Sequence, residues 1–174
     1  MEKKSSYNVA VVGATGAVGK QIIRLLEERN FPIQQLKLLA SARSKGTIVS
    51  FKGKEYQVEE ATPESFAGID FALFSAGGKI SKFFAPHAVE SGAIVIDNTN
   101  AFRMDSKVPL VVPEVNMTEA YHHHGIIANP NCSTIQMVTA LKPLYDRYGI
   151  ERIIVSILAI TESIIFLVVV LCIS

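Results

Sequence analysis

The feature that most constrains this fold is a short apolar run followed by three evenly spaced glycines. Residues 8–12 are almost all apolar, as is typical of a strand buried on both faces. Gly13, Gly16 and Gly19 follow, and residues 20–29 then have the apolar spacing of a helix. This order predicts a strand, a tight turn and a helix. We expect the inward face of that helix to consist of Ile22, Ile23, Leu25 and Leu26.

A glycine turn between a strand and a helix lets backbone N–H groups approach a phosphate at the start of the helix. The spacing is not the strict G-x-G-x-x-G pattern, because the gap from Gly13 to Gly16 is one residue longer. In its strand–turn–helix setting the motif nevertheless predicts a dinucleotide site. The alternative is a tight turn with a packing role only.

Strand and helix patterns alternate along the rest of the chain. This alternation predicts a Rossmann-like, doubly wound and mostly parallel α/β sheet. The expected strands are residues 36–40, 69–74, 93–96, 110–112 and 126–128, the expected helices are 80–90 and 135–148, and a hairpin is expected over 47–51 and 54–58.

The segment after the second predicted strand indicates which dinucleotide is bound. An NAD site usually has an acidic residue about 20 residues after the glycines, but residues 41–45 contain no carboxylate. Arg43 and Ser44 offer donors that suit a 2′-phosphate, so we expect NADP. The alternative is a solvated basic loop. Ser75, Ala76 and Gly77 follow another strand and are small enough for close contact with the cofactor, or they form a plain turn.

Cys132 is the candidate nucleophile. It follows the turn-forming pair Asn129-Pro130 and directly precedes the predicted helix 135–148. Thiols at helix N-termini tend to be reactive thiolates, although a lone cysteine is otherwise more often buried and inert. Arg103 lies just past a strand end, where it is either a surface residue or a clamp for a carboxylate or phosphate. A dinucleotide turn with an activated cysteine predicts an oxidoreductase of aldehydes or acyl phosphates.

Composition excludes several other classes of protein. The 174 residues are 49% hydrophobic and 19% charged with a net charge of +1, which indicates a globular domain rather than a disordered chain. The sequence has no basic stripe with interleaved aromatic residues, so we expect no nucleic-acid partner. Two cysteines and the lack of a signal-peptide core favour the cytoplasm. The three adjacent histidines at 122–124 read as a solvated loop, and no metal site is expected.

Several motifs together resemble the aspartate-semialdehyde dehydrogenase family. The resemblance runs from residue 7 to about 156 and is most specific in the string NPNCST. Its motifs are GATGAVG at 13–19, SARSKG at 41–46, FSAGG at 74–78, VIDNTNAFRMD at 95–105, VPLVVPEVN at 108–116 and GIIANPNCSTIQMV at 125–138.

The resemblance implies a reaction and a set of residue roles. The reaction is the NADP-dependent reductive dephosphorylation of L-aspartyl-4-phosphate to L-aspartate-4-semialdehyde, in the biosynthesis of lysine, diaminopimelate, threonine, methionine and isoleucine. Full-length members are expected to be homodimers or homotetramers. The implied roles are pyrophosphate binding by Thr15, Gly16, Ala17 and Val18, 2′-phosphate binding by Arg43 and Ser44, phosphate binding by Arg103, thioester formation by Cys132, and shaping of the site by Asn131.

The chain departs from the family pattern after residue 156. We expect an NADP-binding domain over 7–156 and an atypical apolar tail over 157–174, with the substrate and dimerisation domain missing. The family's substrate-orienting glutamine, its substrate-binding arginine and its general-base histidine have no counterpart here. We therefore expect a truncated gene product whose tail comes from a shifted reading frame or a disrupted locus. We expect it to bind NADP weakly, to have little activity and to aggregate.

Three hypotheses remain at this point. The first is an incomplete dehydrogenase of this family, and the second is an NADP-binding module without turnover. The third is a small membrane-tethered protein, although the uninterrupted apolar run 164–173 is shorter than the roughly 20 residues of a membrane span. The tail is also a candidate for a substitute strand of the sheet, because residues 168–170 have high β-propensity.

Overall fold

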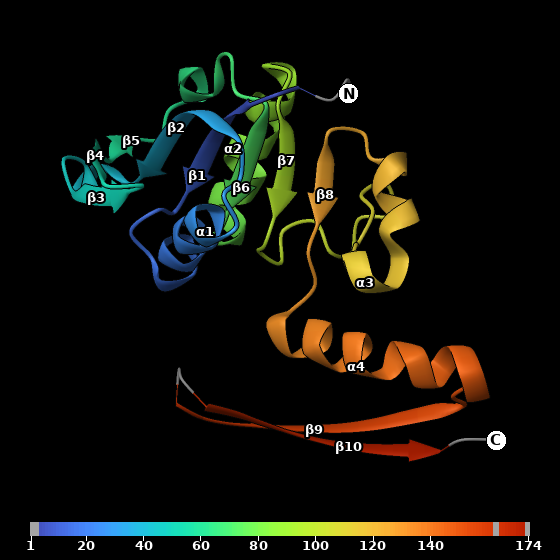
Figure 1. The fold of residues 1–174 in the computed structure, drawn as a ribbon. Coiled ribbons are helices and arrows are strands. Elements are labelled where there is room, and N and C mark those ends of the chain that lie inside the picture. Colours follow the sequence, from blue (N-terminus) through green and yellow to red (C-terminus); the bar gives the residue numbers. More distant parts are fainter. Residues whose placement is uncertain (1–3, 162–163, 173–174) are drawn as a thin grey trace.

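The computed structural model describes residues 4–161 and 164–172, with side chains described over 4–155. Its centre is a six-stranded sheet in the order β5-β2-β1-β6-β7-β8, and every neighbouring pair is parallel (Figure 1). The chain winds outward from β1 in one direction and then in the other, which confirms the predicted doubly wound sheet. Its strands are β1 Tyr7–Val12, β2 Ile33–Ala40, β5 Glu59–Glu60, β6 Phe71–Phe74, β7 Ile94–Asp97 and β8 Ile126–Ala128.

Helices on the two faces of the sheet create two cores. Val9 and Val11 pack with Ile23 of α1 (Ala17–Glu28), whereas Ala10 and Val12 pack with Ala85 of α2 (Gly78–Glu90). Successive residues of a strand point to opposite faces, so β1 must be apolar throughout when both faces are covered. All four of these β1 residues are buried.

Smaller elements surround the sheet. The predicted hairpin is confirmed as β3 (Ile48–Phe51) and β4 (Lys54–Gln57), which pair antiparallel. It turns at Lys52 and Gly53, both with positive φ. The remaining short helices are η1 Ala42–Ser44, η2 Pro63–Phe66, α3 Pro113–Asn116 and η3 Met117–His122.

Two local predictions are wrong. Leu25 is exposed rather than inward-facing, because it lies about 200° around the helix from the buried Ile23. Residues 110–112 do not form a strand, and only Leu110 makes an isolated parallel bridge, to Ala128. Pro113 begins α3 directly afterwards, and a proline has no N–H with which to extend a ladder.

The C-terminal part lies beyond the carboxyl ends of the strands (Figure 1). Helix α4 (Cys132–Tyr148) is followed by β9 (Arg152–Thr161) and β10 (Ile164–Cys172), which pair only with each other among the described strands. The expectation of a tail strand that completes the main sheet is therefore wrong. The proposed domain boundary at 156/157 falls inside β9. None of the helices in the described residues has the length and hydropathy needed to cross a membrane.

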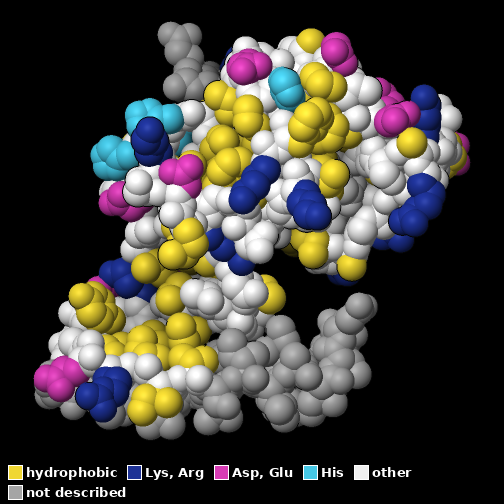
Figure 2. All heavy atoms as spheres, turned by 180° about the vertical axis from the view of Figure 1, so that it is seen from behind, with side chains coloured by type: hydrophobic (Ala, Val, Ile, Leu, Met, Phe, Trp, Pro, Cys, Tyr) yellow, Lys and Arg dark blue, Asp and Glu magenta, His cyan; other side chains and the backbone are white. Residues whose placement is uncertain are grey.

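The described residues cover the apolar face of helix α4 only in part. Ser133 is its one buried residue in the described part of the chain, and Leu144, Tyr145 and Tyr148 are exposed. Figure 2 shows hydrophobic side chains gathered over this lower part of the molecule. The predicted amphipathic pattern of the helix is thus present without the burial that usually accompanies it.

Phe66 anchors the core on the α2 side of the sheet. It is fully buried and stacks on Phe74, with ring centroids 5.8 Å apart. We expect Phe66→Ala to lower the free energy of unfolding by about 3–5 kcal/mol, because it removes a buried ring and leaves a cavity. Phe83→Ala is the control. Phe83 is 57% exposed, so its substitution should lower the free energy of unfolding far less. Urea unfolding measures both, and equal losses would contradict this account of the core.

Asp70 fixes the N-terminal segment to the sheet. Its carboxylate accepts a hydrogen bond from Lys4 Nζ (2.5 Å) and another from the backbone N–H of Asn8 (2.8 Å). These bonds, the one from Lys4 first, lower the pKa of Asp70 below its ordinary value of 3.8. The stabilisation is therefore present above that value and is lost as the pH falls through the lower folded-state pKa.

We expect the difference in unfolding free energy between the wild type and Asp70→Asn to shrink as the pH falls below about 4. Urea titrations at a series of pH values measure this difference. Glu55→Gln is the control, because Glu55 is exposed and makes no ion pair among the described residues. A difference that stays constant with pH would contradict the role given to Asp70.

Candidate active site

A cleft of about 370 Å³ lies at the carboxyl ends of β1, β2 and β6. Ligands of open α/β sheets bind at this edge, where the strand order changes direction. The cleft brings together residues from four separate segments of the chain, within 12–16, 40–44, 60–61 and 75–84. The predicted cofactor residues that line it are Gly13, Thr15, Gly16, Arg43, Ser44, Ser75 and Ala76.

Two glycines allow the elements around this cleft to approach one another. Gly13 has φ +91°, and a Cβ there would lie 2.9 Å from both Ala76 N and Ser75 Oγ. A Cβ on Gly19 would collide with the carbonyl oxygen of Gly13. Helix α1 can therefore start directly against the end of β1 only when both positions are glycine.

The first turn of α1 is open towards an anion. Gly16 is its N-cap, and no side chain caps the helix. The unpaired N–H groups of a helix start favour a phosphate. Ala17 and Val18, assigned to the pyrophosphate from the sequence, are exposed in this turn but do not line the cleft itself. Gly77 is likewise outside the lining and is the N-cap of α2.

The loop after β2 forms the far side of the cleft. Thr15 Oγ1 donates a hydrogen bond to Ser44 Oγ (3.4 Å), which links the glycine turn to η1. Arg43 is exposed at the same wall of the cleft. This arrangement offers a guanidinium and a hydroxyl to a group bound at the end of β2, and it fits the donor set of a 2′-phosphate.

Cys132 is the first residue of α4 and its thiol is exposed. Asn131 is the N-cap, and its Oδ1 accepts hydrogen bonds from Ser133 N (3.0 Å) and Ser133 Oγ (2.6 Å). The Cys132 Sγ lies 3.9 Å from the same oxygen. The helix start expected from the sequence is therefore present, and the alternative of a buried cysteine does not hold.

Arg103 is tied to the turn that leads into Cys132. Its Nε donates to the carbonyl oxygen of Asn129 (2.9 Å) and its Nη2 to that of Asn98 (3.1 Å). The side chains of these two asparagines also bond, with Asn129 Nδ2 2.6 Å from Asn98 Oδ1. The loops after β7 and β8 are thus joined, and Arg103 is a partly buried residue of this junction rather than a free surface arginine.

A buried carboxylate supports the junction from below. Asp97 ends β7, is fully buried, and accepts hydrogen bonds from Ser81 Oγ (2.9 Å), Thr99 N (3.1 Å) and Thr99 Oγ1 (2.9 Å). Thr99 Oγ1 in turn accepts from Ala101 N (3.1 Å). These bonds fix the path of the loop that carries Asn98 and Arg103, and they satisfy the carboxylate inside the core.

Sequence reasoning missed several residues of these two sites. Asn98 and Asn129 join the loops around Cys132. Each is a polar residue directly after one of two neighbouring parallel strands, and this pattern could have identified them from the sequence. Glu60 and Ala61 line the dinucleotide cleft although they lie far along the chain from the glycine turn. Only the pairing of β5 with β2 brings them there.

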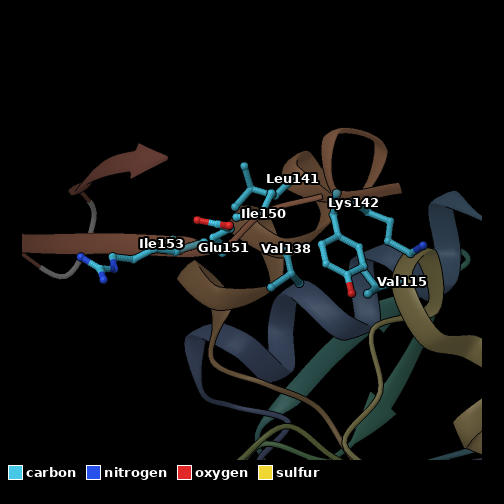
Figure 3. A pocket seen from close by; sticks show the side chains of 9 residues that line it. Val115, Val138, Leu141, Lys142, Ile150, Glu151 and Ile153 are labelled. Atoms are coloured by element: carbon cyan, nitrogen blue, oxygen red, sulfur yellow. The ribbon is translucent and has the colours of Figure 1, made fainter. Parts of the chain in front are cut away.

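A second cavity of about 320 Å³ lies between α3, α4 and the start of β9. Figure 3 shows Val138 and Leu141 of α4 there, with Ile150 and Ile153 from the following segment. Its lining is mainly apolar and contains none of the predicted site residues. The described part of the chain also holds no group of three or more His, Cys, Asp or Glu side chains suited to a metal ion.

Comparisons with known proteins agree with this geometry. The family model described as "Semialdehyde dehydrogenase, NAD binding domain" matches residues 8–123. Aspartate-semialdehyde dehydrogenase of Bacillus subtilis is 63% identical over 149 residues, which are 86% of this chain and 43% of that protein.

Two solved structures are also similar. Aspartate-semialdehyde dehydrogenase II of Vibrio cholerae, complexed with ASA, has 52% identity and a TM-score of 0.82, over 87% of this chain and 50% of that one. The enzyme of Candida albicans, with NADP, has 28% identity and a TM-score of 0.72, over 89% and 51%. The chain thus spans about half the length of these relatives or less.

The matched family model covers most of the chain, and the parallel sheet with its glycine turn has the architecture that this model describes. The chain therefore belongs to the semialdehyde dehydrogenase family, and the matched residues are its NAD-binding domain.

Proposed function

We propose that this chain provides the NADP-binding and nucleophile-bearing part of an aspartate-semialdehyde dehydrogenase. The reaction is the reductive dephosphorylation of L-aspartyl-4-phosphate to L-aspartate-4-semialdehyde, a step towards the aspartate-derived amino acids. The observation that carries the proposal is the junction in which Arg103 bonds to Asn129, three residues before the exposed Cys132. It places a cation and a thiol on adjoining loops at the ligand-binding edge of a dinucleotide fold.

NADP fits the dinucleotide cleft. The open first turn of α1, from Gly16 to Val18, would hold the pyrophosphate, with Thr15 beside it. Arg43 and Ser44 would hold the 2′-phosphate, and Ser75 and Ala76, with Gly77 just outside the lining, leave room for close contact with the cofactor. The Candida albicans relative was solved with NADP, which supports this choice.

Cys132 is the proposed nucleophile. Its thiolate would attack the carbonyl carbon of aspartyl phosphate, forming a carbon–sulfur bond while the carbon–oxygen bond to phosphate breaks. Inorganic phosphate leaves with the electron pair, and Arg103 would bind its oxygens. The reduced nicotinamide, when bound, would supply a hydride to the thioester carbon, and the carbon–sulfur bond would then break to release the aldehyde and regenerate the Cys132 thiolate. Asn131, which caps α4 and lies beside Sγ, would hold Cys132 at the helix start.

The share of the relatives that this chain covers favours a second candidate function. It spans 43% of the Bacillus subtilis protein and 50% of the Vibrio cholerae chain. The residues that match the relatives contain the dinucleotide cleft, so the second candidate is an NADP-binding module without turnover of its own. Activity and dinucleotide binding, measured together, separate the two functions.

We expect Arg43→Gln to weaken NADP binding by about tenfold or more, because it removes a charge-assisted contact to the 2′-phosphate. NAD lacks that phosphate, so its affinity should change little. Fluorescence titrations with both dinucleotides measure the effect. Arg29→Gln is the matched control, since Arg29 is exposed at the end of α1 and does not line the cleft. An equal loss for NAD and NADP would count against the role of Arg43.

Cys132→Ala tests the proposed nucleophile. The assay is phosphate-dependent reduction of NADP with L-aspartate-4-semialdehyde, and we expect the variant to lose any wild-type turnover by about 10³-fold or more. Retained turnover in Cys132→Ala would disprove the thioester route. Absence of turnover in both proteins, with NADP binding intact, would establish the binding module instead. Ser50→Ala, which removes an exposed hydroxyl on β3 that does not line the cleft, controls for a general effect of substitution.

A further inference from the structure

Glu60 lies at the strand end beside which dinucleotide-binding folds contact the adenosine ribose. Strand β5 pairs parallel with β2, so that Glu60 lies opposite Ala40 at the carboxyl end of β2. Ala61 N donates to Ala40 O (2.9 Å), which continues the pairing one residue further. The acidic residue of NAD-binding folds contacts the ribose 2′-hydroxyl beside this strand end. Here a carboxylate reaches the same cleft from another strand.

Glu60 and its basic neighbours have opposite effects on a phosphate bound at the 2′ position of the adenosine ribose. Arg43 and Ser44 line the cleft together with Glu60 and favour a phosphate. A carboxylate beside them repels a 2′-phosphate but accepts a hydrogen bond from a 2′-hydroxyl. Lys45 Nζ lies 3.8 Å from Glu60 Oε2 and partly cancels that negative charge.

We propose that Glu60 is a specificity-determining residue that opposes the 2′-phosphate of NADP and favours the 2′-hydroxyl of NAD, and that the Lys45–Glu60 ion pair restrains this opposition. Arg43 and Glu60 then set the cofactor preference between them. The inference rests on the proposed dinucleotide site and adds a discriminating residue to it.

The ion pair has little to contribute to folding. The side chains of Lys45 and Glu60 are 64% and 44% exposed, and exposed pairs of this kind add little to stability. A change in either residue should therefore alter the ratio of NADP to NAD affinity without altering the unfolding transition. A residue with only a structural role would change both affinities together.

The experiment titrates the intact chain with NADP and with NAD. Relative to wild type, we expect Glu60→Gln to bind NADP about three- to fivefold more tightly and NAD no more tightly. Lys45→Gln should weaken NADP binding. The loss should be smaller in the double variant with Glu60→Gln, because Lys45 then has no Glu60 carboxylate to neutralise. These differences should shrink as salt is raised.

Glu59→Gln is the matched control. Glu59 precedes Glu60 in β5, is also exposed, and does not line the cleft, so it reports any effect of net charge alone. The inference is overturned if wild type binds NADP but Glu60→Gln changes the affinities for NADP and NAD equally. It is also overturned if Glu60→Gln changes them no differently from Glu59→Gln. Failure of wild type to bind either dinucleotide would overturn the proposed function as well, so the two failures are distinguishable.

Discussion

The close contact between the start of α1 and the glycine turn is the constraint on which the rest of this structure depends. A side chain on Gly19 would collide with the carbonyl of Gly13, and one on Gly13 would crowd the backbone at Ala76. Without these side chains the helix begins at the very end of β1, and its uncapped first turn opens into the cleft. The open helix start at the carboxyl end of β1 is a consequence of this packing.

The parallel sheet gathers the remaining chemistry at one edge. Loops that follow β1, β2 and β6 line the cleft, while those after β7 and β8 carry Arg103 and Cys132. Hydrogen bonds between Asn98, Asn129 and Arg103 then connect two of these loops across neighbouring strands. The buried carboxylate of Asp97 holds the first of them to the core. The candidate nucleophile is thus positioned by residues far from it in sequence.

The apolar face of helix α4 is exposed in part, at Leu144, Tyr145 and Tyr148. Its apolar residues recur at helical spacing, yet Ser133 is its only buried residue in the described part of the chain. The matched region covers 43% of the Bacillus subtilis relative and 50% of the Vibrio cholerae chain.

The sequence by itself determined the local elements and the order in which they follow one another. The buried strands, the glycine turn, the hairpin at Lys52 and Gly53 and the helix start at Cys132 all follow from short-range periodicity and turn chemistry. The prediction from the sequence was wrong at residues 110–112, where a proline ends a strand-like pattern. It was also wrong at Leu25, whose exposure depends on which face of the helix meets the sheet.

Only the tertiary structure decided which distant residues share a site. Glu60 reaches the dinucleotide cleft because β5 pairs with β2, and Asn98 meets Asn129 because β7 and β8 are neighbours. Strand order is set by long-range packing of both sheet faces, and no local pattern in the chain encodes it.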